Sequence, residues 1–397
     1  MTGPLAGVRI IDLTTMVSGP YCTMALADQG ADVIKVEAPG GDYSRHVATR
    51  RGGFSASFVN NNRNKRSIVL DLKRDAARDV LLEMCAGADV FIQNFRPGVA
   101  ERMGLGEAVL RERRADLIYV SISGFGFDGP YANRPVFDPL IQALSGLTTV
   151  QGGSDEGRPR LVRTILPDKL TAIQASQAIS AALFARERHG IGQHVRLSML
   201  DTIVAFLWSS DMGGHTFVGD ELERETAQSY IDLIYETRDR FVTIAVMQDK
   251  HWRSFCEVVG RPELAEDPRF ATPAAREINK DERTRLTQEL VAERDGAELL
   301  AALERADVPC APVLTRREMI THPQIEANEI LLRSEHPRAG QLRQTRAPAR
   351  FSRTPGGLRR PAPGLGEHTR ELLDELGLSP ARIESLIAQG AAQVGAS

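Results

Sequence analysis

The chain has 397 residues, which is long for a single hydrophobic core and favours two domains. Hydrophobic residues make up 42% and charged residues 25% of it, as in soluble globular proteins. The net charge of −3 argues against a general nucleic-acid-binding protein, and no apolar run reaches the ~18 residues that suggest a membrane span.

The four cysteines lie far apart and form no CxxC pair, so we expect reduced, mostly buried thiols. No signal peptide precedes Leu5, and the eight histidines show no ligand spacing such as HExxH. These features predict a cytoplasmic protein without a metal site, a membrane partner or a nucleic-acid partner.

The first elements predict a βαβ unit. Gly7–Leu13 (GVRIIDL) is a short strand rich in β-branched residues, and a helix follows from about Tyr21 to Gln29. Gly30 ends that helix, and Ala31–Glu37 (ADVIKVE) is a second buried strand. The unit predicts an α/β fold with a parallel sheet and right-handed crossovers.

A dinucleotide-binding site is one interpretation of this unit. Glu37 closes the second strand, where such folds place the acid that binds the ribose. The first turn, Thr14–Pro20, has one glycine and no GxGxxG, so the phosphate cradle is missing and NAD binding is disfavoured.

A polar run precedes the third strand. Asn60–Asn62 suit a loop with left-handed backbone conformations, and Arg63, Lys65 and Arg66 follow. These cations form either a solvated surface loop or a grip on a phosphate. A strand that alternates apolar and polar side chains is expected over Ser67–Leu72.

Further strands and loops alternate with helices. The apolar spacing predicts a helix over Asp75–Ala86, and Ala88–Phe95 is a strand with Asn94–Gly98 at its carboxyl end. Open α/β sheets bind ligands at that edge. The next strand, Leu117–Ser123, ends in the glycine-rich loop Gly124–Pro135, which is typical of a flexible active-site rim.

Asp168 is the main candidate for chemistry. A basic extended run with three arginines ends at Pro167, and a helix of small residues continues from Asp168 to about Arg188. An Asp in this position is commonly an N-cap that accepts an amide hydrogen of the first turn. The helix dipole would also keep the carboxylate ionised and oriented, as a carboxylate nucleophile requires. Asp138, within a helix that starts near Val136, is a second candidate carboxylate.

The character of the sequence changes near residue 225. Gln193–Met199 and a helix through Trp208 complete the first α/β part, and antiparallel strands in the runs SYIDLIYET and RFVTIAVM open an α+β part. We therefore predict four segments: a large α/β domain over 1–205, a linker over 206–224, a small α+β domain over 225–330, and a linker with a C-terminal segment over 331–397.

Several runs together resemble the family III CoA-transferases, also called the CaiB/BaiF family, which include formyl-CoA:oxalate and carnitine CoA-transferases and are related to α-methylacyl-CoA racemases. The matching runs are GVRIIDLTTMVSGPYCTMALADQGADVIKVE, NRNKRSIVLDLK, ADVFIQNFRPGVAERMGL, SISGFGFDGPYANRPVFDPLIQALSG, PDKLTAIQASQAISAALFARERHGIGQHVRLSMLD and PGLGEHTRELLDELGLS. The resemblance is nearly continuous from residue 5 to 205 and resumes in the C-terminal segment.

The resemblance implies a fold and a reaction. The fold is a Rossmann-like large domain built from both chain ends plus a smaller domain from the middle, in an interlocked homodimer. The family's nucleophile falls on Asp168, which attacks an acyl-CoA thioester and then carries CoA as an aspartyl thioester. Acyl-CoA and a small carboxylic acid are the implied substrates, and no cofactor is bound permanently.

The resemblance also assigns positions that bind CoA. Val17 and Ser18 line the pantetheine arm, Leu70–Lys73 run along the adenosine, and Asn94–Arg96 form a contact at the strand end. Arg102 meets a phosphate, and Arg134–Phe137 lie near the thiol. Named singly, these positions are Val17, Ser18, Leu70, Asp71, Leu72, Lys73, Asn94, Phe95, Arg96, Arg102, Arg134, Pro135, Val136 and Phe137.

Two positions depart from the family. Some members carry an arginine that stacks on adenine directly after the second strand, where this chain has Ala38. The racemase relatives carry a catalytic histidine where this chain has Phe137, and α-proton exchange would lose one of its two acid–base groups. Transfer is therefore preferred over an acyl-CoA racemase that uses Asp168 as a base, and over a catalytically silent CoA-binding protein.

Overall fold

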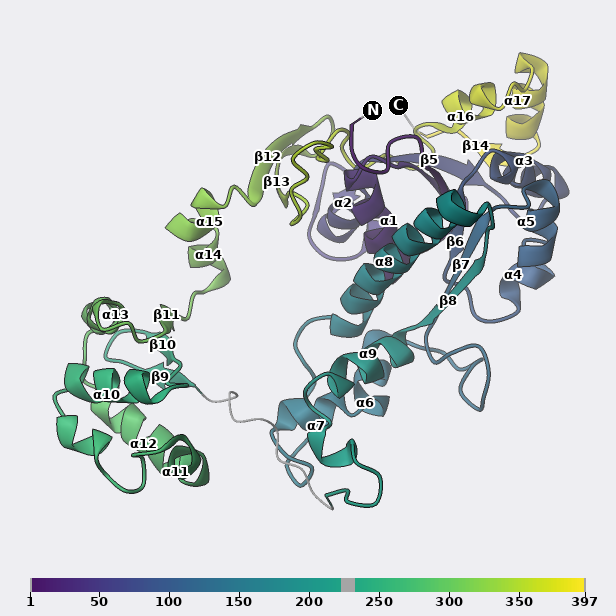
Figure 1. Cartoon of the computed structure of the whole chain (residues 1–397). Coiled ribbons are helices and arrows are strands. Elements are labelled where there is room, and N and C mark those ends of the chain that lie inside the picture. Colours follow the sequence, from purple (N-terminus) through teal and green to yellow (C-terminus); the bar gives the residue numbers. More distant parts are fainter. Residues whose placement is uncertain (1, 223–232, 396–397) are drawn as a thin grey trace. The chain divides into compact units, whose positions relative to one another are not determined.

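A largely parallel sheet organises the larger of two compact units in the computed structural model, which describes residues 2–222 and 233–395 (Figure 1). Within this part of the chain the sheet has seven strands in the order β14-β5-β2-β1-β6-β7-β8. Only β14 runs antiparallel to its neighbour. The strands are β1 (Arg9–Asp12), β2 (Asp32–Glu37), β5 (Lys65–Leu70), β6 (Val90–Gln93), β7 (Ile118–Ser123), β8 (His194–Ser198) and β14 (Ala392–Gln393).

Helices cover both faces of this sheet, because its strands are apolar on both sides. Successive residues point to opposite faces, so Ile10 and Ile11 belong to different cores. Helices α1 (Ser18–Asp28) and α8 (Leu166–His189) pack on the Ile10 face. The Ile11 face is covered by α3 (Asp75–Ala86), α5 (Glu107–Arg113), α16 (Thr369–Glu375) and α17 (Pro380–Ala388). The predicted α/β class with a parallel sheet is confirmed.

Shorter elements complete the larger unit. They are η1 (Tyr43–His46), β3 (Arg50–Arg51), β4 (Phe54–Ser55), α2 (Ala56–Asn62), α4 (Val99–Arg102), α6 (Asp138–Leu144), α7 (Leu147–Gly152), α9 (Met199–Trp208), η2 (Gly213–His215), β12 (Leu331–His336) and β13 (Gly340–Thr345). None of the described helices combines the length and the apolar character needed to cross a membrane.

The smaller unit is an α+β layer with its own core. Its antiparallel sheet has the order β11-β10-β9, and the core contains Trp252, Phe255 and Phe270. Its elements are β9 (Ile234–Glu236), β10 (Phe241–Ile244), α10 (Asp249–Val258), η3 (Pro262–Ala265), α11 (Pro273–Ile278), α12 (Lys280–Val291), α13 (Gly296–Arg305), β11 (Cys310–Pro312), α14 (Arg316–Met319) and α15 (Pro323–Ala327).

The larger unit is discontinuous in sequence. It runs from the N-terminal part to Gly152, continues from Glu156 to the start of the undescribed segment, and resumes at Glu329. The smaller unit joins Gly153–Asp155 to the residues that end at Asn328. The C-terminal segment therefore contributes a strand, β14, and two helices to the sheet whose first strand is β1.

Three predictions of local structure were wrong or incomplete. Asn60–Asn62 end helix α2 instead of forming a loop, because Ser55 caps that helix and Phe58 anchors it in a core. The third strand starts at Lys65 and is buried throughout, not alternating. The segment after residue 331 forms the hairpin β12–β13, not a linker. Part of the strand predicted in SYIDLIYET lies outside the described residues.

Candidate active site

The carboxyl ends of β1 and β6 mark the point where the chain switches sides in the sheet. From β1 the chain continues through β2 to β5 on one side, and β6 lies on the other side of β1. The side chain of Asn94 bridges the crevice: its Oδ1 accepts the Thr15 N–H at 3.0 Å and its Nδ2 donates to the Thr15 carbonyl at 2.9 Å. Ligands of open α/β folds bind at such a switch point.

A buried ion pair fixes the turn between β1 and α1. Asp12 Oδ2 lies 3.0 Å from Lys65 Nζ, and both side chains are fully buried. The same carboxylate accepts hydrogen bonds from the Thr14 N–H at 2.9 Å and from the Thr23 hydroxyl at 2.6 Å. Lys65 and Lys35 act together against burial and lower the pKa of Asp12 to about 2.

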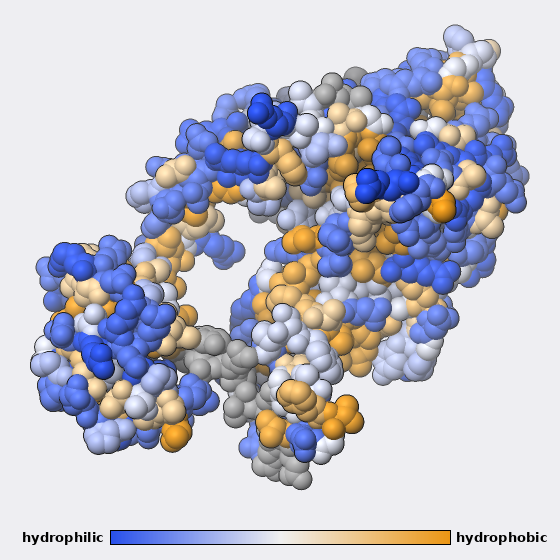
Figure 2. Space-filling view, viewed as in Figure 1, coloured by the Kyte–Doolittle hydropathy of each residue, from blue (hydrophilic) through white to orange (hydrophobic). Residues whose placement is uncertain are grey.

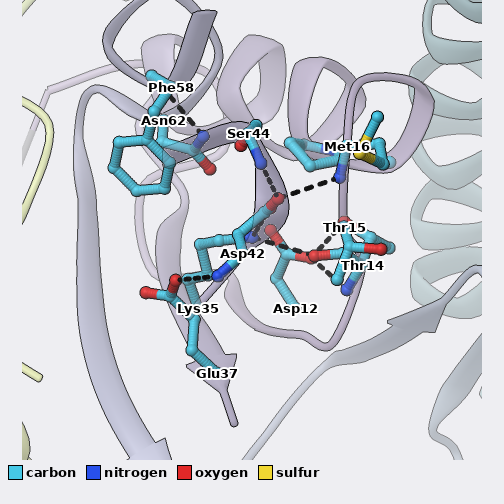
Figure 3. A network of polar contacts seen from close by, with 12 residues as sticks. Asp12, Thr14, Thr15, Met16, Lys35, Glu37, Asp42, Ser44, Phe58 and Asn62 are labelled. Atoms are coloured by element: carbon cyan, nitrogen blue, oxygen red, sulfur yellow. Dashed lines mark hydrogen bonds and ion pairs between the residues drawn. The ribbon is translucent and has the colours of Figure 1, made fainter. Parts of the chain in front are cut away.

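A second buried pair continues this network (Figure 3). Lys35 Nζ lies 2.9 Å from Asp42 Oδ2 and donates to the Thr14 carbonyl at 2.8 Å. Asp42 Oδ1 accepts the N–H of Met16 at 3.2 Å, and Met16 has the left-handed φ of 70°. Because a non-glycine residue rarely adopts this conformation, the network holds the turn in a strained form directly before Ser18.

The cations predicted to form a solvated loop or a phosphate grip do neither. Arg63, Lys65 and Arg66 are at most 5% exposed. Arg63 Nη2 lies 2.6 Å from Asp28, and Arg66 lies 2.7 Å from Asp32 and also pairs with α16. All three cationic side chains are therefore paired with carboxylates of the protein itself. The sequence pattern does not identify these partners.

Glu37 is likewise unavailable to a ribose. Its carboxylate is 4% exposed, and its two oxygens accept bonds from Arg45 at 2.8 and 2.6 Å. The Ser67 hydroxyl adds a third bond at 2.8 Å. The acid that a dinucleotide fold would use is therefore structural in this protein.

Asp168 lies in the first turn of α8, three positions after the residue that caps the helix. The N-cap is Ile165, so Asp168 is the third residue of the helix and the N-cap prediction is wrong. Pro167 occupies the second position, where its missing N–H costs no helical hydrogen bond. The hydroxyl and the backbone N–H of Ser18, the first residue of α1, act as hydrogen-bond donors to the Asp168 carboxylate. The N-termini of α1 and α8 therefore meet at this carboxylate.

Asp138 lies behind Asp168 and is 4% exposed. Its Oδ2 accepts the backbone N–H of Asp168 at 3.2 Å, and its Oδ1 accepts from Gln142 Nε2 at 2.6 Å. Gln142 Oε1 in turn accepts the N–H of Val162 at 2.9 Å. Asp138 and Gln142 thus tie α6 to the start of α8 and to the extended run before it.

Burial changes the protonation expected for the pair. Desolvation, and secondly the nearby Asp138 charge, raise the pKa of Asp168 to about 6, although the Ser18 donors oppose this. Desolvation also raises the pKa of Asp138. Burial and a second carboxylate therefore oppose the helix dipole, which was expected to keep Asp168 ionised, yet at a pKa of about 6 the carboxylate is still mostly ionised at pH 7.

The structure distributes the other predicted positions along the same sheet edge. Val17 is buried beside Ser18, and Leu70 is fully buried in the core. Residues 71–73 follow β5, two strands from β1, while Arg102 lies on α4 on the side of α3 and α5. Phe95 and Val136 are half-buried, and the exposed positions are Lys73, Arg96, Arg102, Arg134, Pro135 and Phe137.

The rim loop before α6 is packed closely. Arg134 stacks on the ring of Tyr131, with 3.7 Å from its guanidinium carbon to the ring centroid. A Cβ on Gly124 would come within 2.4 Å of the Val136 side chain, so a larger residue there would push Val136 away. Asp138 follows directly after this segment.

Two features of the site were not predicted from the sequence: the Asp138–Asp168 contact and the ion pairs beneath the turn between β1 and α1. Residues 30 positions apart in the chain make the first, and no local spacing signals it. In the part of the chain that the structure describes, no group of three or more His, Cys, Asp or Glu side chains is arranged to hold a metal ion.

Comparisons with known proteins place the chain in one family. The model of CoA-transferase family III matches residues 5–369. A protein named succinyl-CoA:mesaconate CoA-transferase from Haloarcula hispanica is 37% identical over 96% of this chain and 99% of its own. A formyl-CoA:oxalate CoA-transferase from Streptomyces avermitilis is 33% identical over 98% of this chain and 100% of its own. The crystal structure of a CAIB/BAIF family protein from Brucella suis superposes with a TM-score of 0.84, at 31% identity over 95% of this chain and 100% of that one.

Proposed function

The chain belongs to CoA-transferase family III, and from this premise we propose that it moves coenzyme A from an acyl-CoA to a carboxylic acid with Asp168 as the nucleophile. The relatives named above are CoA-transferases that act on CoA thioesters and carboxylic acids. The observation that carries the proposal for this chain is the Asp168 carboxylate, half-buried at the meeting point of two helix N-termini beside the switch point.

The reaction proceeds in four exchanges. The Asp168 carboxylate attacks the thioester carbonyl, and CoA leaves as thiolate while a mixed anhydride forms. The thiolate attacks the aspartyl carbonyl, which releases the first acid and leaves an aspartyl-CoA thioester. The second acid attacks this thioester to give a new anhydride, and the thiolate attacks the acid's carbonyl to form the product. Each step exchanges one acyl bond for another without net proton transfer, and the covalent route divides one difficult transfer into easier steps.

Burial suits Asp168 to this role. A carboxylate with a pKa of about 6 is a stronger base and nucleophile than an ordinary aspartate, yet it is mostly ionised at pH 7. Each attack creates an oxyanion, and the N–H groups in the first turn of α1, which begins at Ser18, have no helical acceptor. Such donors stabilise developing negative charge at a helix start.

The CoA molecule follows the sheet edge in this proposal. Val17 and Ser18 contact the pantetheine arm, residues 70–73 and 94–96 contact the nucleotide part, Arg102 binds a phosphate, and residues 134–137 enclose the thiol end. The exposed cationic side chains of Lys73, Arg96 and Arg102 support this path, because they face solvent at the carboxyl edge. No permanent cofactor takes part.

We further propose that the larger unit is the CoA-binding domain, that the smaller unit is a separate small domain, and that two chains interlock as a homodimer. Exposed apolar side chains on α8 and α9 support a partner surface, and Figure 2 shows hydrophobic residues gathered over this part of the molecule. Ile173, Phe184, Phe206 and Trp208 are 53%, 65%, 47% and 50% exposed. Sedimentation should give twice the 43.5 kDa of the chain, and Phe184→Glu with Phe206→Glu should weaken the dimer.

A trapping experiment tests the reaction. The enzyme is incubated with acyl-CoA and then with hydroxylamine or borohydride, and modification is mapped by mass spectrometry. A transferase is modified at Asp168 and inactivated. A racemase instead exchanges solvent deuterium into the acyl α-carbon with no trapped residue, and a silent CoA-binding protein does neither.

A further inference from the structure

The run from Arg158 to Arg163 lines an open groove of about 1010 Å³ together with Gln151 at the end of α7. Three of its members are arginines, and all three side chains are exposed. Arg158, Arg160 and Arg163 form no ion pair with any residue that the structure describes. The lining contains no acidic side chain, so the groove is a concentration of uncompensated positive charge.

This groove is fixed to the candidate nucleophile through hydrogen bonds. Val162, within the run, donates its N–H to Gln142 Oε1 at 2.9 Å. Gln142 bonds to Asp138 at 2.6 Å, and Asp138 accepts the N–H of Asp168 at 3.2 Å. The backbone of Arg160 is tied separately to the Thr148 carbonyl at 2.8 Å. The three arginines therefore lie on a segment that hydrogen bonds fix in place, and this segment leads into the first turn of α8.

The charges lie within reach of a bifunctional acid at Asp168. Arg163 precedes Asp168 by five positions, and an extended chain advances at most about 3.3–3.6 Å per residue. Leu166–Asp168 already belong to the helix, where the rise falls to about 1.5 Å per residue. Since an arginine side chain adds several ångströms of reach, a short diacid with one carboxylate at Asp168 can present the other to the groove.

We propose that this groove selects dicarboxylic acids as the acid substrate, with Arg160 and Arg163 binding the carboxylate that does not react. The inference rests on the proposed CoA transfer at Asp168. Arginine suits this role because its planar guanidinium binds carboxylate in bidentate fashion and stays charged at every working pH. The exposed Leu161 supplies apolar contact for the carbon chain between the two carboxylates.

The phosphates of CoA are the other anions that such a groove can take. The positions proposed for CoA phosphates follow β5 and β6 and lie on α4, whereas the groove lies between α7 and α8. A role in CoA binding would raise the KM for acyl-CoA in arginine variants, irrespective of the acid. A role in diacid binding would change only the kinetics of the acid.

Carbon-matched acids test the assignment. Transfer from acetyl-CoA and from succinyl-CoA is measured with glutarate and with valerate, in which a methyl group replaces the second carboxylate. In Arg160→Gln/Arg163→Gln, kcat/KM for glutarate should fall about 10- to 100-fold, as expected for lost charge-assisted hydrogen bonds, while that for valerate changes less than about threefold. Arg163→Lys should recover part of the loss. Arg113→Gln, a change at an exposed arginine in the last turn of α5, should alter the kinetics of neither acid.

Equal losses for both acids, or a raised KM for acyl-CoA alone, would overturn the diacid assignment. Calorimetry of the full chain with glutarate and valerate separates this failure from failure of the proposed function. If wild-type protein transfers no CoA but binds glutarate more tightly than valerate through the two arginines, the transfer proposal fails and the groove assignment stands. If wild-type protein binds both acids equally, the groove assignment is wrong whatever the activity.

Discussion

The Asp138 carboxylate accepts the backbone N–H of Asp168 at 3.2 Å, so two carboxylates share the start of α8. One of them, at 4% exposure, anchors the helix, and the other is half-buried and faces the donors of Ser18. The anchoring carboxylate also repels the charge on its neighbour, which links the geometry of this site to its titration.

The first prediction concerns the nucleophile. Asp168→Asn should lower CoA transfer by at least about 10³-fold and leave the dissociation constant for CoA within about twofold, because the amide cannot form the anhydride. Asp201→Asn is the matched control, since Asp201 is likewise the third residue of a helix, α9, and is exposed. Transfer by the Asp168 variant at more than a few per cent of the wild-type rate would remove the assignment.

The same substitution should stabilise the protein. The pKa of Asp168 is raised in the folded state, so its ionised form opposes folding above about pH 6 and the penalty disappears below the unfolded pKa of about 4. We expect Asp168→Asn to raise the free energy of unfolding by about 1–3 kcal/mol at pH 7 and to have little effect at pH 4. Urea unfolding at the two pH values, at fixed protein concentration, measures the difference; equal effects at both would contradict the shifted pKa.

The third prediction concerns the pH dependence of activity. Transfer requires ionised Asp168, so kcat/KM should fall as the pH drops through about 6. Asp138→Asn removes one of the charges that raise this pKa while its amide oxygen can still accept the Asp168 N–H. The acid limb of the profile should therefore move to lower pH. Asp128→Asn, an exposed change in the rim loop, should leave the limb in place; an unmoved limb in the Asp138 variant would show that its charge does not reach Asp168.

The buried pair under the first turn yields a stability prediction. Lys65→Met leaves Asp12 without its closest cation and should cost about 3–5 kcal/mol of unfolding free energy. Asp12→Asn/Lys65→Met removes both charges and should recover more than half of that loss. Thermal and urea unfolding of the two single variants and the double variant give the coupling energy, and additive losses would mean that the pair contributes no coupling.

The hydrogen bonds between Asn94 and Thr15 yield a prediction about the positioning of the turn before Ser18. Asn94→Ala removes both hydrogen bonds to Thr15, so the turn before Ser18 is no longer tied to β6. We expect kcat/KM to fall about tenfold with little change in stability, since the crevice is at the sheet edge. Asn133→Ala, in the exposed rim loop, is the comparison. A normal rate in the Asn94 variant would mean that the turn holds its form without the bridge.

The helices and strands predicted best from the sequence are those with a clear pattern of apolar residues. The helix α3 begins and ends where its apolar spacing does, and β1, β2 and β7 follow β-branched runs bounded by glycine or polar residues. The hairpin β12–β13 was missed because its strands are largely polar, and its turn packs, through Ala339, against Phe54 and Phe58 far away in the sequence. Propensity in the run before Arg63 also gave way to distant packing, since Phe58 anchors α2.

The candidate nucleophile was identified from its place at a helix start and from resemblance, but its environment was not. Three cations at Arg63, Lys65 and Arg66 look like surface charge or a ligand grip in sequence, and only the fold shows that Asp28, Asp12 and Asp32 neutralise them. The raised pKa of Asp168 depends in the same way on Asp138, which reaches it through space. The ionisation state of a side chain depends on neighbours in the fold, and a local sequence pattern does not identify them.

The locked ion pairs beneath the turn after β1 have a consequence for how such an enzyme changes over time. Charges that are dry and mutually satisfied tolerate few replacements, whereas the Arg158–Arg163 run faces open water and can vary freely. Exchanging that short run between homologous enzymes should therefore exchange their preference for acid substrates and leave the covalent chemistry unchanged. New substrate preferences would then evolve by substitution in the Arg158–Arg163 run, while the ion pairs beneath the turn after β1 stay constant.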